Sequence, residues 1–137
     1  MASLKETIRK VTQASGWMIG HVKTPDGKIP YRTNQVYRVE SANTLRIYSR
    51  EESNGAPDDI SAIEVTFQDK NVQSGTYDID SRAVTAAYLP FGSEAQYAES
   101  GTVTIERFED EVLLGQIQFV TADYATRVVF IMQGING

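Results

Sequence analysis

Paired carboxylates are the feature of this chain whose spacing comes nearest to catalytic or metal chemistry. Asp78 and Asp80 stand two positions apart in a segment that reads as a strand, so both side chains face one side. Such a pair could act as the two acids of a glycosidase, or supply two oxygen ligands to calcium. Because Asp80 ends the strand and Arg82 follows closely, a solvated face is the simpler interpretation. We predict no metal and no cofactor, with Asp78 and Asp80 as the candidates if a metal is bound.

Other reaction chemistry finds little support in the sequence. The chain has no cysteine and a single histidine, His21, which excludes thiol catalysis and multi-histidine metal sites. A Ser-His-acid relay would need His21, which falls in a strand pattern, and no G-x-S-x-G elbow accompanies it. No phosphate-binding glycine motif is present either. The sequence therefore predicts a protein that is not an enzyme.

Aromatic residues offer a candidate binding surface instead. Tyr37, Arg38, Arg46 and Tyr48 fall within one expected hairpin, and Trp17 is the only tryptophan of the chain. Tyrosine, tryptophan and arginine are typical anchors of protein interfaces. Tyrosine is also a good strand former that packs with its hydroxyl in water, so an ordinary half-buried role stays open. We predict that these five residues form a contact surface.

Composition and charge limit the possible partners. The chain has 137 residues, which fits one domain spanning 1–137, and its formal net charge is −5 with a pI of about 4.8. This acidic balance argues against nucleic-acid binding. Residues 1–50 hold nine basic and three acidic side chains, whereas residues 51–137 hold four basic and fifteen acidic ones. Either basic strands pair with acidic strands in one sheet, or a basic face and an acidic face favour head-to-tail self-association.

Hydrophobic periodicity predicts one helix followed by strands. Residues 1–15 show the capping box Ser3-x-x-Glu6 and an apolar stripe, so we expect a helix that packs on the sheet. From residue 16 to 137 the period changes to two, with turn signals every 8–12 residues. About nine short strands follow, separated by loops at 50–59 and 90–100 and by a charged hairpin tip at 109–111.

This pattern predicts an all-β fold with one N-terminal helix. An antiparallel β-sandwich or a flattened β-barrel fits, because so many strands must fold over or close to protect their edges. A barrel would allow a calycin-like cavity for a small apolar ligand. Lipocalins carry a G-x-W motif near their first strand, whereas Gly16 and Trp17 are adjacent here.

No secretory signal and no membrane span are evident. Charged residues interrupt the first sixteen positions, and no apolar stretch approaches the roughly 18 residues that a spanning helix needs. We therefore expect a cytoplasmic protein, with a removed leader or another export route left open.

The second half contains the segments Gly75-Thr76-Tyr77, Ala87-Tyr88, 100–105 and 114–119, and a last expected strand that ends near Gly134. In these segments, over about residues 75–134, it resembles a family of small bacterial β-sandwich domains of unassigned function, often found as lipoproteins. The resemblance implies a non-catalytic β-sandwich of bacterial origin and carries no functional residues with it. The chain departs from the family in lacking the lipid-attachment cysteine and in adding the N-terminal helix.

Taken together, these features predict a non-enzymatic binding module. We expect it to self-associate, or to bind a protein partner, through its Tyr/Arg-rich surface. The alternative is a calycin-like barrel for a small apolar ligand, and the third possibility is a carboxylate-dependent, glycosidase-like enzyme.

Overall fold

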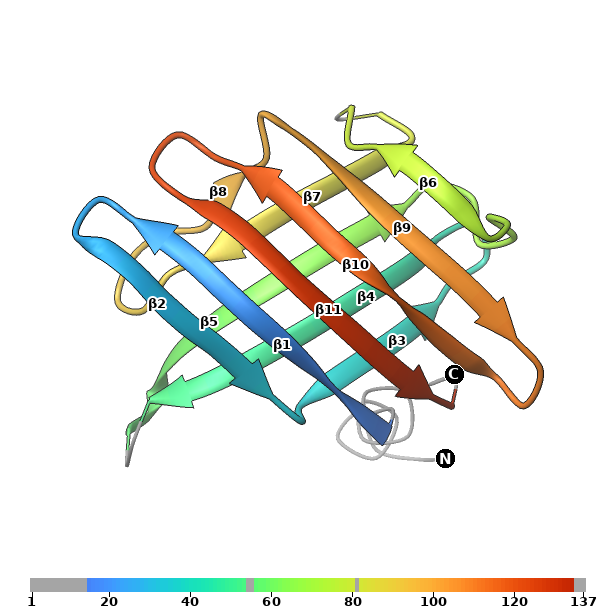
Figure 1. The fold of residues 1–137 in the computed structure, drawn as a ribbon. Coiled ribbons are helices and arrows are strands. Elements are labelled where there is room, and N and C mark those ends of the chain that lie inside the picture. The colour runs from blue at the N-terminus through green and yellow to red at the C-terminus, as the bar shows by residue number, and fades with distance from the viewer. Residues whose placement is uncertain (1–14, 54–55, 81, 135–137) are drawn as a thin grey trace.

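The chain folds into two antiparallel sheets that face each other and do not close into a barrel. The computed structural model describes residues 15–53, 56–80 and 82–134, which hold eleven strands. Figure 1 shows the strands of one sheet crossing those of the other steeply, as in orthogonally packed sheets. The sequence prediction of an all-β fold is confirmed. The flattened barrel is wrong, and so is the count of about nine strands, because the described residues hold eleven.

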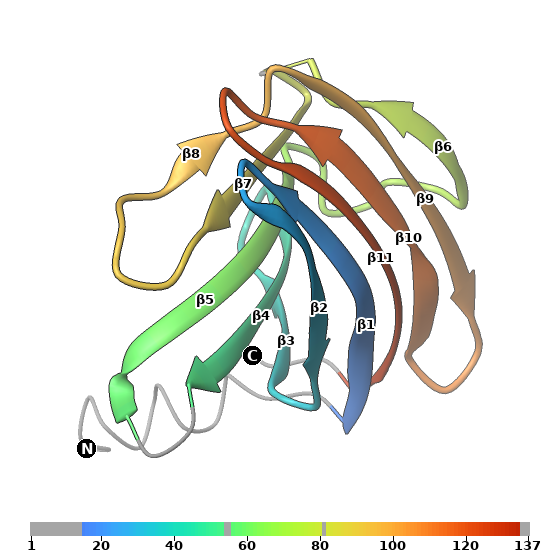
Figure 2. The same ribbon diagram turned by 60° about the vertical axis from the view of Figure 1, so that its left-hand side comes forward.

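The first sheet has six strands, most of them joined by tight hairpins. Its order is β2 (Gly27–Thr33), β1 (Ser15–Thr24), β11 (Ala125–Gln133), β10 (Val112–Val120), β9 (Ser100–Phe108) and β6 (Gly75–Asp78). Strand β1 therefore pairs with the last strand of the chain, although about a hundred residues separate them. Figure 2 shows these strands bending around the interior.

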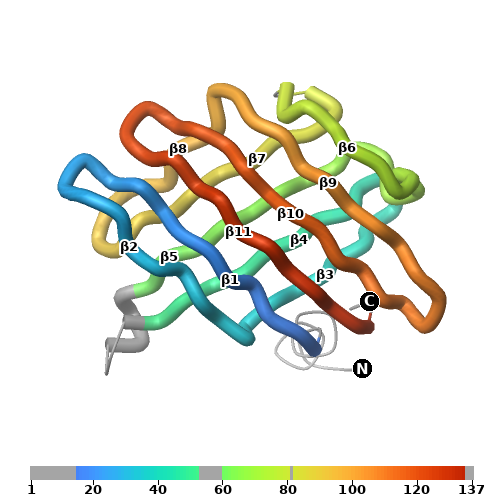
Figure 3. The backbone as a smooth tube through the Cα atoms, in the orientation of Figure 1, coloured from blue at the N-terminus to red at the C-terminus, as the bar shows by residue number. Residues whose placement is uncertain are grey.

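The second sheet has five strands, and the chain enters it directly from the first sheet. Its order is β3 (Val36–Glu40), β4 (Leu45–Ser53), β5 (Ala56–Phe67), β7 (Val84–Leu89) and β8 (Gln96–Tyr97). The chain passes directly from β2 to β3, so two strands that follow each other belong to different sheets. The tube in Figure 3 lets the reader follow this crossing and the return from β8 to β9.

Alternating side chains fill the space between the sheets. In β5, Ile63, Val65 and Phe67 are buried, as their period of two predicts. The largest fully buried side chains come from both sheets: Tyr31, Tyr88, Phe67, Phe119, Met18, Leu45 and Ile47 among them. The hydroxyl of Tyr31 lies 2.8 Å from Oγ of Ser49 and so links β2 to β4 across the core. Burial raises the pKa of Tyr31.

A charged cluster lies at one end of the sandwich. Nη2 of Arg107 in β9 lies 3.2 Å from Oε1 of Glu40 in β3, and its Nη1 donates to the carbonyl of Val72 at 2.7 Å. These contacts join the two sheets and a loop in one place. Here a polar network holds the two sheets together, as apolar packing does elsewhere. It can do so because both charged groups have hydrogen-bond or ion-pair partners.

Three expected elements differ from the structure or lie outside its described residues. Residues 1–14 of the helix predicted over 1–15 lie outside the described residues, and Ser15 is the first residue of β1. The loop expected at 50–59 is wrong, because β4 and β5 extend through most of it. Glu51 stabilises this polar strand end by accepting the N–H of Arg32 at 2.9 Å. The loop expected at 90–100 contains the short strand β8. The described residues include no helix that could cross a membrane.

Candidate interaction surfaces

A compact aromatic and charged cluster lies on the outer face of the five-stranded sheet. Tyr37 of β3 and Tyr48 of β4 stand directly opposite each other, with ring centres 5.2 Å apart and planes inclined at 39°. Glu64 of β5 is the next residue across, opposite Tyr48. We call Tyr37, Arg46, Tyr48 and Glu64 the tyrosine face. Both tyrosines are half-buried, and burial raises the pKa of Tyr37.

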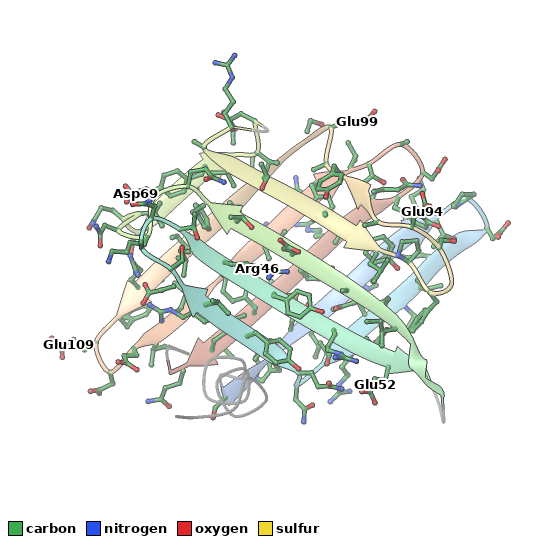
Figure 4. All side chains as sticks on the ribbon, turned by 180° about the vertical axis from the view of Figure 1, so that it is seen from behind. Arg46, Glu52, Asp69, Glu94, Glu99 and Glu109 are labelled. Atoms are coloured by element: carbon green, nitrogen blue, oxygen red, sulfur yellow. The ribbon has the colours of Figure 1, made fainter. Side chains whose placement is uncertain are left out.

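Arg46 completes this cluster. Its guanidinium carbon lies 5.0 Å from the centre of the Tyr48 ring, and its Nη2 lies 2.9 Å from Oε2 of Glu64. Arg46 is 45% exposed and Glu64 is 36% exposed. Figure 4 shows Arg46 near the middle of this face. An exposed ion pair of this kind adds little to folding stability. Arg46 and Glu64 can therefore change partners at little cost, and the guanidinium and the Tyr48 ring can contact a binding partner.

Arg38 lies on the other side of the sheet from these residues. Neighbouring residues of a strand point to opposite faces, so Arg38 points inward where Tyr37 points outward. It is only 4% exposed, and its Nη1 donates to the backbone carbonyl of Glu111 at 3.1 Å. Burial lowers the pKa of its guanidinium. The structure therefore separates Arg38 from the surface for which the sequence proposed it.

Trp17 lies on the outer face of the other sheet. It is 44% exposed and stands opposite Ile131 of β11, which in turn stands opposite Leu114 of β10. One step along, Ile19 stands opposite Val129. These five side chains form an apolar strip across three strands. The structure thus brings Tyr37, Arg46 and Tyr48 together but places Trp17 on the opposite outer face.

The carboxylates of Asp78 and Asp80 do not act as a pair. Strand β6 ends at Asp78, which stands opposite Thr102, and Asp80 lies in the following turn. Oδ1 of Asp80 accepts the backbone N–H groups of Arg82 at 2.9 Å and Val84 at 3.2 Å. These bonds hold the pKa of Asp80 below its ordinary value. Both residues are exposed. Across the described part of the chain, no three acids, histidines or cysteines are grouped to hold a metal ion.

A groove that sequence analysis did not predict crosses the outer face of the six-stranded sheet. Its volume is about 760 Å³, and it runs over β2, β1, β11, β10 and β9 near the end where β1 finishes. Ile19 and Val129, which stand opposite each other, give the groove an apolar part. The rows towards the β1–β2 turn are basic, and they contain His21, Lys23, Lys28 and Arg127. We call this surface the basic groove.

Two glycines shape the floor of this groove. A Cβ at Gly20 would come within 2.0 Å of the carbonyl oxygen of Arg127, and one at Gly101 within 2.3 Å of the carbonyl oxygen of Gln118. Only glycine permits the neighbouring backbones to approach so closely. Gly101 also adopts a φ of +155°. The approach at Gly101 lies within the β9–β10 hairpin, whereas the approach at Gly20 joins β1 to β11, which are distant in sequence. Periodicity along the chain could not reveal this second approach.

Comparisons of the chain with protein-family models, with curated proteins and with solved structures found no match. The fold places it in the class of all-β proteins built from two antiparallel sheets. A function for it must therefore be argued from the surfaces that these sheets expose.

Proposed function

We propose that this chain is a non-enzymatic interaction module that binds a second copy of itself through the tyrosine face. The observation that carries the proposal is the array of the half-buried Tyr37 and Tyr48 with the exposed Arg46 on the outer face of a sheet. Half-buried tyrosines lose little side-chain freedom on binding, and arginine adds directional hydrogen bonds. Such residues are enriched in protein interfaces.

The charges on this face make it self-complementary. Arg46 and Glu64 carry opposite charges and lie 2.9 Å apart, so two copies related by a two-fold axis could exchange these partners. Each Arg46 would then face the Glu64 of the other copy, while the tyrosine rings pack between them. A two-fold contact of this kind uses the same surface twice, and closed dimers are the commonest form of homo-oligomer.

Sedimentation velocity of three variants tests this proposal. Arg46→Glu places two carboxylates side by side, and we expect it to remove the two-fold contact and so lower the sedimentation coefficient at a given concentration. Arg46→Glu with Glu64→Arg restores the opposite charges and should restore the assembly. Arg82→Glu, an exposed arginine away from the face, is the control. If Arg46→Glu sediments like the wild type, the tyrosine face is not the contact.

A further inference from the structure

The basic groove holds like charges in positions that cost folding stability. Lys23 of β1 stands directly opposite Lys28 of β2, and His21 stands opposite Arg127 of β11. The two lysines carry like charges, and like charges directly across a sheet repel each other. Among the side chains described in residues 15–52, 60–80 and 82–134, no carboxylate forms an ion pair within 4.0 Å of any of these four side chains. The arrangement is unfavourable in the isolated chain and favours an anionic partner.

The hairpin between β9 and β10 carries the matching chemistry. Its tip consists of Glu109, Asp110 and Glu111, all exposed, and Phe108 beside it is 53% exposed. We call these four residues the acidic tip. The groove offers cations next to an apolar side formed by Ile19 and Val129, and the tip offers carboxylates next to an aromatic ring. The two surfaces are therefore complementary: cations match carboxylates, and apolar side chains match the aromatic ring.

The backbone of the acidic tip is strained and firmly held. Asp110 and Glu111 have φ values of 60° and 59°, a left-handed conformation that glycine adopts far more easily than glutamate. Arg38 donates to the carbonyl of Glu111 at 3.1 Å, and the N–H of Gly134 donates to the same oxygen at 3.2 Å. These bonds fix the tip in one shape. A surface that is ordered before it binds loses less entropy in the complex.

Groove and tip lie at opposite ends of the six-stranded sheet. The turn between β1 and β2 is at one end, whereas the turn between β9 and β10 is at the other, as Figure 1 shows. Figure 4 shows Glu109 at the edge of the molecule. The tip of one chain therefore cannot reach its own groove. It can reach the groove of another copy, and that copy presents its own free tip in turn.

We infer that the acidic tip of one copy docks in the basic groove of the next, in a head-to-tail contact. This contact differs from the two-fold contact of the tyrosine face and does not depend on it. Phe108 packs against Ile19 and Val129, while the carboxylates of the tip pair with Lys23, Lys28 and Arg127. Because donor and acceptor surfaces differ, the contact repeats and forms a ring or a filament.

Charge reversal on each side tests the contact. The groove variant is Lys23→Glu with Lys28→Glu, and the tip variant is Glu109→Lys with Glu111→Lys. We expect the sedimentation coefficient of the wild type to grow with concentration. Each variant alone presents like charges on both surfaces, so each should lose this growth. Mixed in equal amounts, the two variants present opposite charges at every contact and should assemble again. Ionic strength of about 1 M, where the Debye length falls to about 3 Å, should dissolve the contact.

Two controls make the result specific. Asp78→Lys with Glu94→Lys changes the net charge as the tip variant does, at exposed acids outside the tip, and should assemble like the wild type. Far-UV circular dichroism verifies that every variant is folded. The variant Arg46→Glu leaves groove and tip intact, so it should keep the head-to-tail contact even if it abolishes the two-fold one.

Several results would overturn the inference. It fails if the groove and tip variants grow with concentration like the wild type, or if their mixture assembles no further than either variant alone while the wild type does. A wild-type protein that remains a monomer at every concentration also contradicts it. So does a small anionic molecule that native mass spectrometry finds on the wild type and that the groove variant loses.

Discussion

Nη1 of Arg38 lies 3.1 Å from the backbone carbonyl oxygen of Glu111, so a buried side chain of the five-stranded sheet fixes the hairpin tip of the other sheet. Seventy-three positions separate the two residues. This contact joins the sheets where β3 faces the start of β10. The conformation of the exposed tip therefore depends on a residue that is itself buried.

Replacing Arg38 by alanine should therefore destabilise the fold and loosen the tip. The change removes a buried hydrogen bond and leaves Glu40, 3.9 Å from Nη2, with fewer partners. We expect a loss of about 2–4 kcal/mol in the free energy of unfolding, measured by urea denaturation. Arg46→Ala, in an exposed ion pair, is the matched control and should cost less than about 1 kcal/mol. Equal effects of the two substitutions would contradict this role for Arg38.

Alanine at Gly20 should be costly even though β1 is otherwise regular there. Its Cβ would approach the carbonyl oxygen of Arg127 to 2.0 Å and Cα of Val128 to 2.7 Å, so β1 and β11 would have to separate. We expect a loss of about 2–3 kcal/mol in the free energy of unfolding. The backbone amides of both strands should also exchange faster with solvent in a hydrogen-exchange measurement. Gly92→Asn is the control, because Gly92 has a left-handed φ of +68° that asparagine tolerates and open space around it. It should change stability by less than about 1 kcal/mol.

Asp80 should make the protein sensitive to acid. Backbone N–H groups stabilise its carboxylate and lower its pKa in the folded state, with Arg82 contributing most. The stabilisation is therefore present above the unfolded pKa of about 3.9 and is lost as the pH falls through the folded pKa. In Asp80→Asn, the free energy of unfolding should decline less between neutral and acidic pH than in the wild type. An identical decline in Asp80→Asn and in the wild type would exclude this role.

Tyr88 should have the opposite effect in alkali. Burial, helped by Tyr124, raises its pKa to about 12 in the folded protein. Above the unfolded pKa of about 10, the unfolded chain ionises this tyrosine while the folded chain keeps it protonated. Stability is therefore lost as the pH rises from about 10 toward 12. Guanidinium denaturation should show a smaller alkaline decline for Tyr88→Phe than for Tyr97→Phe, whose side chain is 74% exposed.

Local sequence patterns predicted most of the strands but only part of the surface. The alternation of Ile63, Val65 and Phe67 and the charged tip at 109–111 appear in the structure as expected, because both are local features. The pairing of basic with acidic strands is realised between Arg46 and Glu64. The same alternation should have separated Tyr37 from Arg38, since adjacent strand residues face opposite sides.

The basic groove could not be predicted in this way. It needs β1, β11, β10 and β9 to lie side by side, and the strands that contribute His21 and Arg127 are far apart in sequence. Strand β8 escaped notice for a different reason. It has only two residues, and its place depends on pairing with β7 rather than on any pattern of its own.

The partial exposure of Trp17 gives the protein a built-in optical reporter. As the single tryptophan, it is the sole source of indole fluorescence in the chain. It stands on the outer face of the six-stranded sheet, two residues before Ile19 of the basic groove. Its emission therefore depends on how much water contacts that face. Binding of a partner there can be followed by the intrinsic fluorescence of the unlabelled protein.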